Sequence, residues 1–210
     1  MITPTVPAPA IPSAKTAPTR PAPAASATRP GTAAITAARK ALHASAMSDA
    51  IWVPLISAIL VLAVGALSLA TKRPWLIASL GPSAMLLASN PGHPTTRFHA
   101  IVLGHFTAFV SAWIALLLMG ASAAPAALGS PVSVARVWAG AFAIALTAVV
   151  QPSLKAYHPP AAATALLITL GVHKLTVNNS VAMLGGVLLV AVLGEWFQRV
   201  RLQQRRAAGA

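Results

Sequence analysis

Residues 51–70 read IWVPLISAILVLAVGALSLA, which is twenty consecutive residues without a charge. As an α-helix this stretch would extend about 30 Å, which matches the hydrocarbon thickness of a lipid bilayer. Ser48 and Asp49 stand immediately before it, where a helix N-cap is expected. The stretch therefore predicts a membrane-spanning helix, and it sets the class of fold for the rest of the chain.

Further apolar runs follow this first one, separated by short polar breaks, at residues 74–89, 100–124, 134–150, 159–171 and 181–197. Three of these are long enough to cross a bilayer. The runs 74–89 and 159–171 are shorter; the first is interrupted at Gly81-Pro82 and the second begins at a proline pair. We therefore expect an all-α polytopic membrane protein with four full transmembrane helices and two short proline-headed helices.

The order of the runs is long, short and long, and this order occurs twice. The two halves are offset by roughly 80 residues, which predicts two three-helix repeats. Inverted repeats of this kind are typical of transporters. The alternative is that any polytopic bundle of alanine and leucine runs looks similar to itself.

Charge is scarce and unevenly placed. The chain is 57% hydrophobic and 8% charged, with 15 Lys and Arg residues against two acids, whereas a soluble domain carries about a quarter charged residues. Nine of the basic residues lie in the two tails: Lys15, Arg20, Arg29, Arg39, Lys40, Arg199, Arg201, Arg205 and Arg206. This is the distribution of positive charge that flanks membrane spans on the cytoplasmic side. It predicts a cell-membrane protein with both termini in the cytoplasm, in contact with the lipid bilayer and not with nucleic acid.

The number of crossings is not fixed by the charges. With six crossings, eleven basic residues lie inside and four outside; with four crossings and both short segments re-entrant, about ten lie inside and five outside. Both arrangements obey the positive-inside rule, so it does not choose between them.

The tails bound the membrane domain. Residues 1–47 form an Ala- and Pro-rich tail that we expect to be disordered, because it lacks a periodic apolar pattern. Its end, residues 33–47, could instead form a short interfacial helix or extend the first span. The transmembrane domain is expected at residues 48–198, and residues 199–210 form a basic cytoplasmic tail.

The prolines mark the candidate site. Proline suits the first turn of a helix but not its interior, so Gly81, Pro82 and Ser83 would begin one short helix, and His158, Pro159 and Pro160 the other. Such starts would present free N–H groups and positive dipole ends. The small residues after the second start, Ala161 and Thr164 among them, would let an anion approach the backbone. The alternative is two ordinary proline-started helices with small residues for close packing.

Two histidines and an arginine join this site. His158 stands at the proline pair, and His105 lies within an apolar span, where a polar ring is costly unless it faces the bundle. Arg97 opens that span, either as an interfacial arginine or as an anion-attracting residue at a cavity mouth. The loop histidines His93, His99 and His173 are expected to be solvated.

Several classes of chemistry are not favoured. The sequence has no cysteine, and its two acids, Asp49 and Glu195, lie outside or at the end of the apolar runs. We therefore expect no metal, no cofactor and no enzymatic activity, and any proton coupling would have to use histidine, which titrates near neutral pH. Glu195 and Arg199, four residues apart, are expected to form an exposed ion pair.

A family resemblance sharpens these expectations. The stretches YHPPAAATALL (157–167) and SLGPSAMLLAS (79–89), with Arg97 and LGH at 103–105, resemble the HPP family of integral membrane proteins over about residues 50–200. The family motif is matched by His158, Pro159 and Pro160; Gly81-Pro82-Ser83 departs from the Gly-Ala-Ser expected there. The resemblance implies four membrane-spanning helices and a transporter, since plastid and cyanobacterial relatives are linked to nitrite transport.

Together these patterns predict a transporter or channel-like permease for a small anion, with nitrite as the substrate that the resemblance implies. The alternative is a structural or assembly membrane protein without transport activity. Faces of small residues could pair protomers, so we also expect a homo-oligomer.

Overall fold

The structure is a computed structural model that describes residues 32–207, without the side chains of residues 33–34 and 37–47. In this part of the chain all regular secondary structure is helical. The elements are α1 (Thr32–Thr71), α2 (Leu80–Ser89), η1 (Pro94–Thr96), α3 (Phe98–Leu118), α4 (Val134–Ser153), α5 (Ala161–Thr169) and α6 (Val177–Ala207).

Four of these helices are long and apolar enough to cross a membrane, over residues 48–71, 98–118, 134–153 and 177–207. The predicted class, a polytopic all-α membrane protein, is therefore confirmed. Residues 32–47 are helical and continue directly into the first span, which is one of the alternatives stated for residues 33–47. One boundary differs from the expectation, because α6 continues through the basic residues 199–207. The expected disorder of residues 1–31 falls outside the described residues.

The two short helices are each about half as long as a membrane span. α2 has 10 residues and α5 has nine, so each extends about 15 Å or less. Non-helical segments, residues 72–79 and 154–160, lead into them. Each of the two short helices is thus a half-helix that follows an irregular segment. Irregular backbone at membrane depth is tolerated where it is enclosed by protein.

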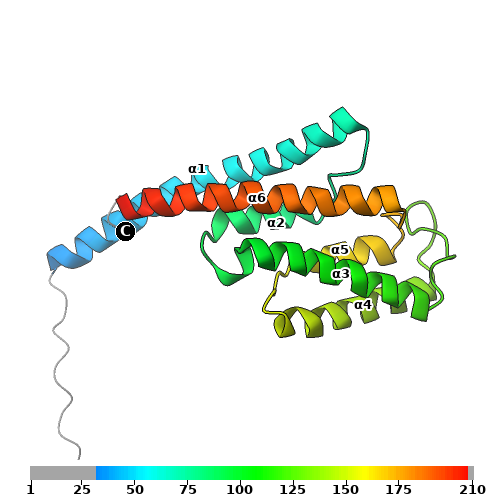
Figure 1. Cartoon of the computed structure of the whole chain (residues 1–210). Helices are drawn as coiled ribbons and strands as arrows, with labels where there is room; N and C mark the ends of the chain where they lie inside the picture. The colour runs from blue at the N-terminus through cyan, green and yellow to red at the C-terminus, as the bar shows by residue number, and fades with distance from the viewer. Residues whose placement is uncertain (1–31, 208–210) are drawn as a thin grey trace, which may run out of the picture. The chain divides into compact units, whose positions relative to one another are not determined.

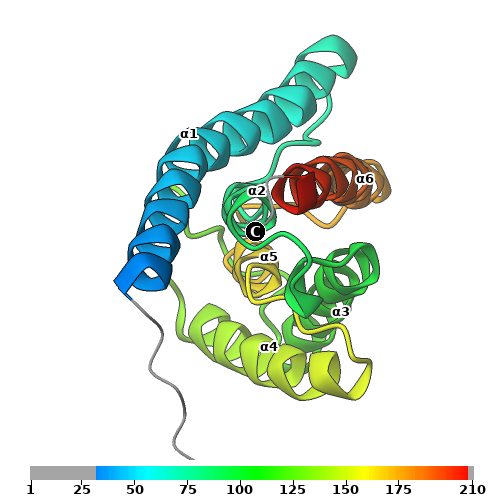
Figure 2. The same cartoon turned by 90° about the vertical axis from the view of Figure 1, so that its left-hand side faces the viewer.

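The half-helices occupy the middle of the bundle. In Figure 2 α2 and α5 lie between the long helices α1, α3, α4 and α6. Figure 1 shows that they run in opposite directions, α2 toward the start of α3 and α5 toward the start of α6. α3 packs against α4, α5 and α6, and α2 packs against α6. The chain therefore contains two repeats, α1–α2–α3 and α4–α5–α6. The half-helix of one repeat runs in the opposite direction to the half-helix of the other.

The bundle has two ends, which we name by a residue at each. At the Gln198 end, the end of α6 meets the loop before α3, where the Gln198 side chain bonds Gly92 and Thr96. At the Arg136 end, the start of α4 meets the end of α5, where Arg136 bonds the Thr169 carbonyl. These two contacts tie segments that are 33 to 106 residues apart in the sequence.

Glycines on α6 allow α2 and the segment before it to approach closely. A Cβ atom at Gly186 would collide with the backbone carbonyl of Trp75, and one at Gly185 with the Trp75 ring. A Cβ at Gly194 would lie 2.6 Å from a Leu87 methyl group. Glycine is needed at Gly185 and Gly186 because a side chain has no space there.

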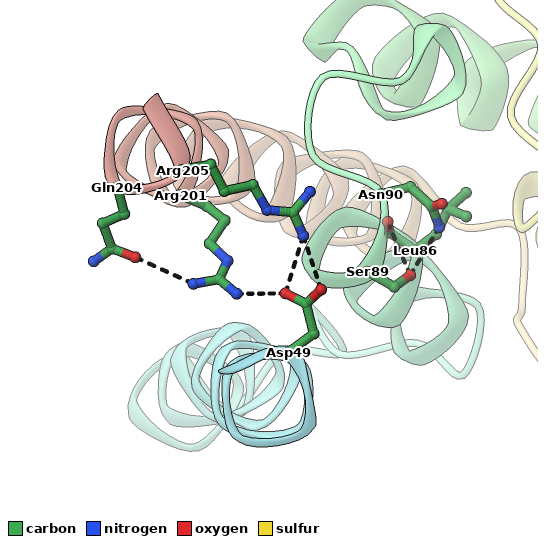
Figure 3. Close-up of polar contacts among 7 residues, drawn as sticks. All are labelled: Asp49, Leu86, Ser89, Asn90, Arg201, Gln204 and Arg205. Atoms are coloured by element: carbon green, nitrogen blue, oxygen red, sulfur yellow. Dashed lines mark hydrogen bonds and ion pairs between the residues drawn. The ribbon is translucent and has the colours of Figure 1, made fainter. Parts of the chain in front are cut away.

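An apolar stripe and an ionic contact join α1 to the rest of the bundle. Ile56, Leu60 and Val64, spaced four residues apart, are buried. Near the Gln198 end, Asp49 accepts hydrogen bonds from the guanidinium groups of Arg201 and Arg205 on α6 (Figure 3). This clamp is the polar tie between α1 and α6 among the described residues. It also neutralises one of the two acids in the sequence.

The tight contact at Gly186 generates a stability prediction. We expect Gly186→Ala to lower the free energy of unfolding by about 1–3 kcal/mol, because the new methyl group meets backbone and not a movable side chain. Gly65→Ala is the matched control, since its Cβ would make only an ordinary contact of 3.7 Å with Leu76. Thermal unfolding of both variants in detergent measures the difference; equal melting temperatures would contradict the assignment.

Candidate functional site

The starts of the two half-helices lie against each other in the centre of the bundle. Ser79 and Ser83 belong to the start of α2, and His158 and Thr164 to the start of α5. The Ser83 hydroxyl oxygen lies 3.0 Å from His158 Nε2. The hydroxyl oxygens of Thr164 and Ser79 lie 2.8 Å apart. Residues 75 to 85 positions apart in the sequence are thus joined by side-chain hydrogen bonds.

His105 completes this cluster from the middle of α3. Its Nε2 atom lies 3.0 Å from the Ser83 hydroxyl oxygen, and its Nδ1 atom lies 2.7 Å from the Thr164 hydroxyl oxygen. The centroids of the His105 and His158 rings are 5.2 Å apart. Ser83 is therefore a bridge between two imidazoles. We call Ser79, Ser83, His105, His158 and Thr164 the central cluster.

The central cluster is closed to solvent. All five of its side chains have a relative exposure of 0%. Buried polar groups are costly unless they are hydrogen-bonded, and here each side chain finds its partner within the cluster or on neighbouring backbone. Four of the predicted site residues, Ser83, His105, His158 and Thr164, are thereby brought together.

Two residues on α3 and α4 hold His158 in this position. Gly104 leaves room for it, since a Cβ there would lie 2.7 Å from the His158 Cβ atom. The buried Gln151 side chain accepts a hydrogen bond from the His158 N–H (3.1 Å) and donates one to the Gly104 carbonyl (3.1 Å). Sequence reasoning missed Gln151, although a glutamine at the end of an apolar helix is a signal that could have been noticed.

A backbone carbonyl holds the other side of the His158 ring. His158 Nδ1 lies 2.8 Å from the Thr95 carbonyl oxygen, which belongs to the η1 turn. Gln198 fixes that turn, because its side chain accepts from the Thr96 hydroxyl and donates to the Thr96 carbonyl, both at 2.9 Å. A carbonyl oxygen only accepts hydrogen bonds, so His158 carries a hydrogen on Nδ1.

The prediction of free N–H groups at the short helix starts is wrong. At α5 the N–H groups of Ala161, Ala162 and Ala163 donate to the carbonyls three residues earlier, at 3.0 to 3.1 Å. At α2 the N–H groups of Leu80, Gly81 and Ser83 also have backbone acceptors. Tight turns just before each helix use these donors. The positive ends of the helix dipoles remain, but side chains provide the hydrogen-bonding groups.

The prolines lie on the other face of the half-helix starts. Pro82 and Pro159 are exposed, Pro160 and Gly81 are partly exposed, and Ala161 is buried behind them. These prolines and Gly81 line an open groove of about 830 Å³ against Ser57, Ala58 and Val61 of α1. The groove is mostly apolar.

Arg97 lies apart from the central cluster. It is exposed and lines a cavity of about 340 Å³ at the Gln198 end, together with His99, Glu195 and Arg199. This position does not choose between the two roles considered for Arg97, and the cavity is a different one from the groove. Glu195 and Arg199 form the predicted ion pair at 3.2 Å.

A second polar cavity opens at the Arg136 end. It measures about 470 Å³, and Arg136, His173 and Lys174 line it with Ser122 and Trp113. The Arg136 guanidinium is buried and donates to the carbonyls of Ala124, Pro125 and Thr169. A side chain at Gly171 would collide with this guanidinium, since a Cβ atom there would lie 2.7 to 2.9 Å from its atoms.

The expectation that His173 is solvated is wrong, whereas His99 is exposed as expected. His173 has a relative exposure of 8%, and its Nε2 atom has no hydrogen-bond partner among the described residues. Burial lowers the pKa of His173. The ring is therefore neutral at pH 7, and the positive charge of this cavity comes from Arg136 and Lys174.

No group of three or more His, Asp or Glu residues in the described part of the chain could hold a metal ion. Two features of the structure could act on a solute. One is the closed, uncharged central cluster, and the other is the cationic cavity at the Arg136 end.

Four spans surround two half-helices that run in opposite directions and meet at a polar centre. This arrangement defines the class of protein, which is a polytopic helical membrane protein built as an inverted repeat. The family model of the HPP transmembrane region matches residues 42–207, and the chain belongs to this family. The resemblance seen in the motifs is thereby confirmed. Comparison with curated proteins and with solved structures gave no match.

The buried Gln151 generates a second stability prediction. We expect Gln151→Leu to lower the free energy of unfolding by about 1–3 kcal/mol, because the His158 N–H and the Gly104 carbonyl lose their partner in a buried place. Gln203→Leu, at an exposed position of α6, is the matched control and should stay within about 0.5 kcal/mol. Chemical or thermal unfolding in detergent compares the two, and a neutral Gln151→Leu would contradict the positioning role.

Proposed function

We propose that this protein transports a small monovalent anion across the membrane, past the point where α2 and α5 meet. The observation that carries the proposal is the meeting of two positive helix ends without a carboxylate. The dipole of each half-helix places partial positive charge at its start, and the N–H groups there are bonded to backbone carbonyls. The sequence has only two acids; Asp49 is paired with Arg201 and Arg205, and Glu195 with Arg199.

This arrangement favours an anion over a cation at the centre of the bundle. A cation would have neither a carboxylate nor a free carbonyl there, whereas an anion would meet two dipole ends and the hydrogens of Ser83, His105 and His158. The central cluster is closed in this structure, so transport requires it to open. Its compactness favours an anion of a few atoms over a larger organic acid.

The cationic cavity at the Arg136 end supports the same assignment. Arg136 and Lys174 bring two positive charges to its wall, and neither acid of the sequence lines it. A cleft with one sign of charge raises the local concentration of ions of the opposite sign. We propose that this cavity is where the anion enters or leaves.

Nitrite is the substrate that we propose within this class. It is a small monovalent anion whose oxygens accept hydrogen bonds, as the donors of the central cluster require. The family resemblance, through relatives linked to nitrite transport, favours it over other anions of similar size.

The orientation follows from the basic residues. The described basic residues at the Gln198 end are Arg97, Lys155, Arg199, Arg201, Arg205 and Arg206, and those at the Arg136 end are Lys72, Arg73, Arg136 and Lys174. By the positive-inside rule we propose that the Gln198 end faces the cytoplasm of a cell-membrane protein. The cationic cavity would then open on the other side.

A structural role is the second candidate, and one observation favours it. The central cluster is dry, and its groups satisfy one another, which is also how a purely structural polar core is built. A structural protein would hold the same contacts without passing a solute, so a flux measurement separates the two candidates.

The flux prediction concerns His158. Purified protein in liposomes at pH 8 should pass nitrite or nitrate faster than empty vesicles, and His158→Ala should lower that flux at least about tenfold by removing a donor from the path. The control is His99→Ala, at an exposed histidine outside the central cluster, with melting temperatures confirming that both variants fold. If neither ion nor formate moves faster than in empty vesicles, the transport proposal fails.

The cavity prediction concerns Lys174. Reversing its charge with Lys174→Glu should raise the half-saturating anion concentration about three- to tenfold, because the cavity loses its attraction for anions. Lys72→Glu reverses an exposed charge near the same end but outside the cavity and is the matched control. The difference should shrink at high ionic strength; the same shift in both variants would argue against an entry site.

A further inference from the structure

We propose that the groove between α1 and α2 binds one acyl chain of an anionic phospholipid, with the headgroup phosphate beside Arg205 at the Gln198 end. This inference goes beyond the proposed transport function and does not rest on it. Two observations carry it: the apolar groove is as long as one leaflet of the bilayer is deep, and its outer end lies beside an unbalanced positive charge.

The groove follows the whole length of α2. The residues that line it from this helix are Gly81, Pro82, Met85, Leu86 and Ser89, whose spacing places them on one helical face. The 10 residues of α2 extend about 15 Å, which is half of the roughly 30 Å hydrocarbon thickness of a bilayer. Because α2 begins at the centre of the bundle, the groove spans one leaflet from the membrane centre to its surface.

The groove opens toward lipid. Ala58, Pro82, Met85 and Pro159 on its walls are exposed at membrane depth. Its lining is mostly apolar, so water is a poor occupant. Its volume of about 830 Å³ lies within the range of sites that enclose hydrophobic ligands, about 300–1,000 Å³. An acyl chain of the surrounding leaflet meets these conditions.

The packing of α1 leaves the groove open. In the second repeat α4 packs closely on α3 and α5, whereas in the first repeat α1 packs less closely on α6 and α2. In the most hydrophobic stretch of each span, 17% of the residues are buried in α1, against 33 to 50% in the other three. The first repeat therefore has an unfilled space where the second repeat has protein contacts.

The outer end of the groove lies close to the clamp between α1 and α6. The groove reaches Ser89, the last residue of α2, at the Gln198 end. The loop after Ser89 contacts α6 at Gln198 and Leu202, within one turn of Arg201. Figure 3 shows the Asp49 clamp in the same region as Ser89. The clamp thus lies at the level where the headgroup of a lipid with its chain in the groove would lie.

The clamp carries an excess of positive charge. One carboxylate, Asp49, is paired with the two guanidinium groups of Arg201 and Arg205, so the three side chains sum to one positive charge. The Arg201 side chain is only 8% exposed, whereas that of Arg205 is 34% exposed and accessible to a phosphate. Basic groups between helices at the membrane surface bind anionic lipid headgroups, and arginine matches the geometry of phosphate oxygens.

Charge also favours a lipid over a second copy of this chain as the occupant. The sequence has only two acids, Asp49 and Glu195, and both are already paired with arginines. A second copy would bring further basic residues and no free carboxylate to the clamp. An anionic phospholipid supplies both the apolar chain and the negative charge.

The first test compares two lipids that differ in headgroup charge. The full-length protein, purified in detergent and stripped of lipid, is titrated with phosphatidylglycerol or phosphatidylcholine of the same acyl chains, and native mass spectrometry counts the bound molecules. The first phosphatidylglycerol should bind about fivefold more tightly, which is the effect of one arginine near an anionic lipid. It should also raise the melting temperature more, because it binds the folded state. Equal affinities would overturn the proposal.

Two neighbouring arginines sharpen this test. Arg205→Gln leaves Asp49 paired with Arg201 and should remove the preference for phosphatidylglycerol. Arg206→Gln removes the same charge from an exposed side chain that has no ion pair among the described residues, and it should keep the preference. The same result for both variants would overturn the headgroup assignment. The unsubstituted protein still decides the proposal if Arg205→Gln fails to fold.

The second test locates the acyl chain. Phosphatidylglycerol with a photoreactive diazirine near the end of one chain is incorporated into liposomes with the protein, and the adducts are mapped by mass spectrometry. Adducts should concentrate at the inner part of the groove, at Val61 and Met85. Ala58→Phe fills the groove and should lose them, whereas Ala66→Phe, at an exposed alanine of α1 outside the groove, should keep them. Adducts spread evenly over the exposed helix faces would overturn the proposal.

The third test examines a second copy as the occupant. The chain has no cysteine, so Ala58→Cys places a single thiol in the groove and Ala66→Cys places one outside it. Disulfide-linked dimers that form faster in liposomes with Ala58→Cys than with Ala66→Cys would show a second copy in the groove and overturn the lipid site. A rate no higher than the control supports it. None of these measurements requires transport, so failure of the lipid site leaves the proposed function unchanged.

Discussion

The structure depends on one constraint: polar groups placed at the centre of a membrane bundle must satisfy one another. Ser79, Ser83, His105, His158 and Thr164 do so through one contact within the first repeat and three that cross from one repeat to the other. The two half-helices can stop at mid-depth because the side chains at their starts find partners on the opposite half. Without that exchange each broken helix would leave polar groups facing hydrocarbon.

Close approach makes this exchange geometrically feasible. Gly104 admits His158, and Gly186 admits the carbonyl of Trp75. The same positions with any side chain would separate α3 from the start of α5, or α6 from the segment before α2. The glycines therefore determine the geometry of the central cluster, since the 3.0 Å contacts of Ser83 with the two imidazoles depend on how closely these elements pack.

Apolar run length and proline position were sufficient to predict four spans, two short helices and their repeat, because these features depend on local sequence. The pairing of His105, His158 and Thr164 was not predictable in detail, since it joins residues 53 and 59 positions apart through tertiary packing. Gln151 and Thr95 were missed for the same reason. The loop position of His173 suggested solvation, but the folded loop buries it. Free N–H groups were expected from helix ends in isolation, whereas the preceding turns use those donors.

The distribution of charge explains how such a site could both bind and release an anion. A fixed arginine at the centre would attract an anion strongly and also hold it, whereas the buried Arg136 stands at one end of the bundle. At the centre, the proposed function leaves attraction to the helix dipoles and to hydrogen-bond donors, which carry no fixed charge. Both acids remain at the Gln198 end, paired with arginines, and this keeps the centre free of the fixed negative charge that would oppose anion entry.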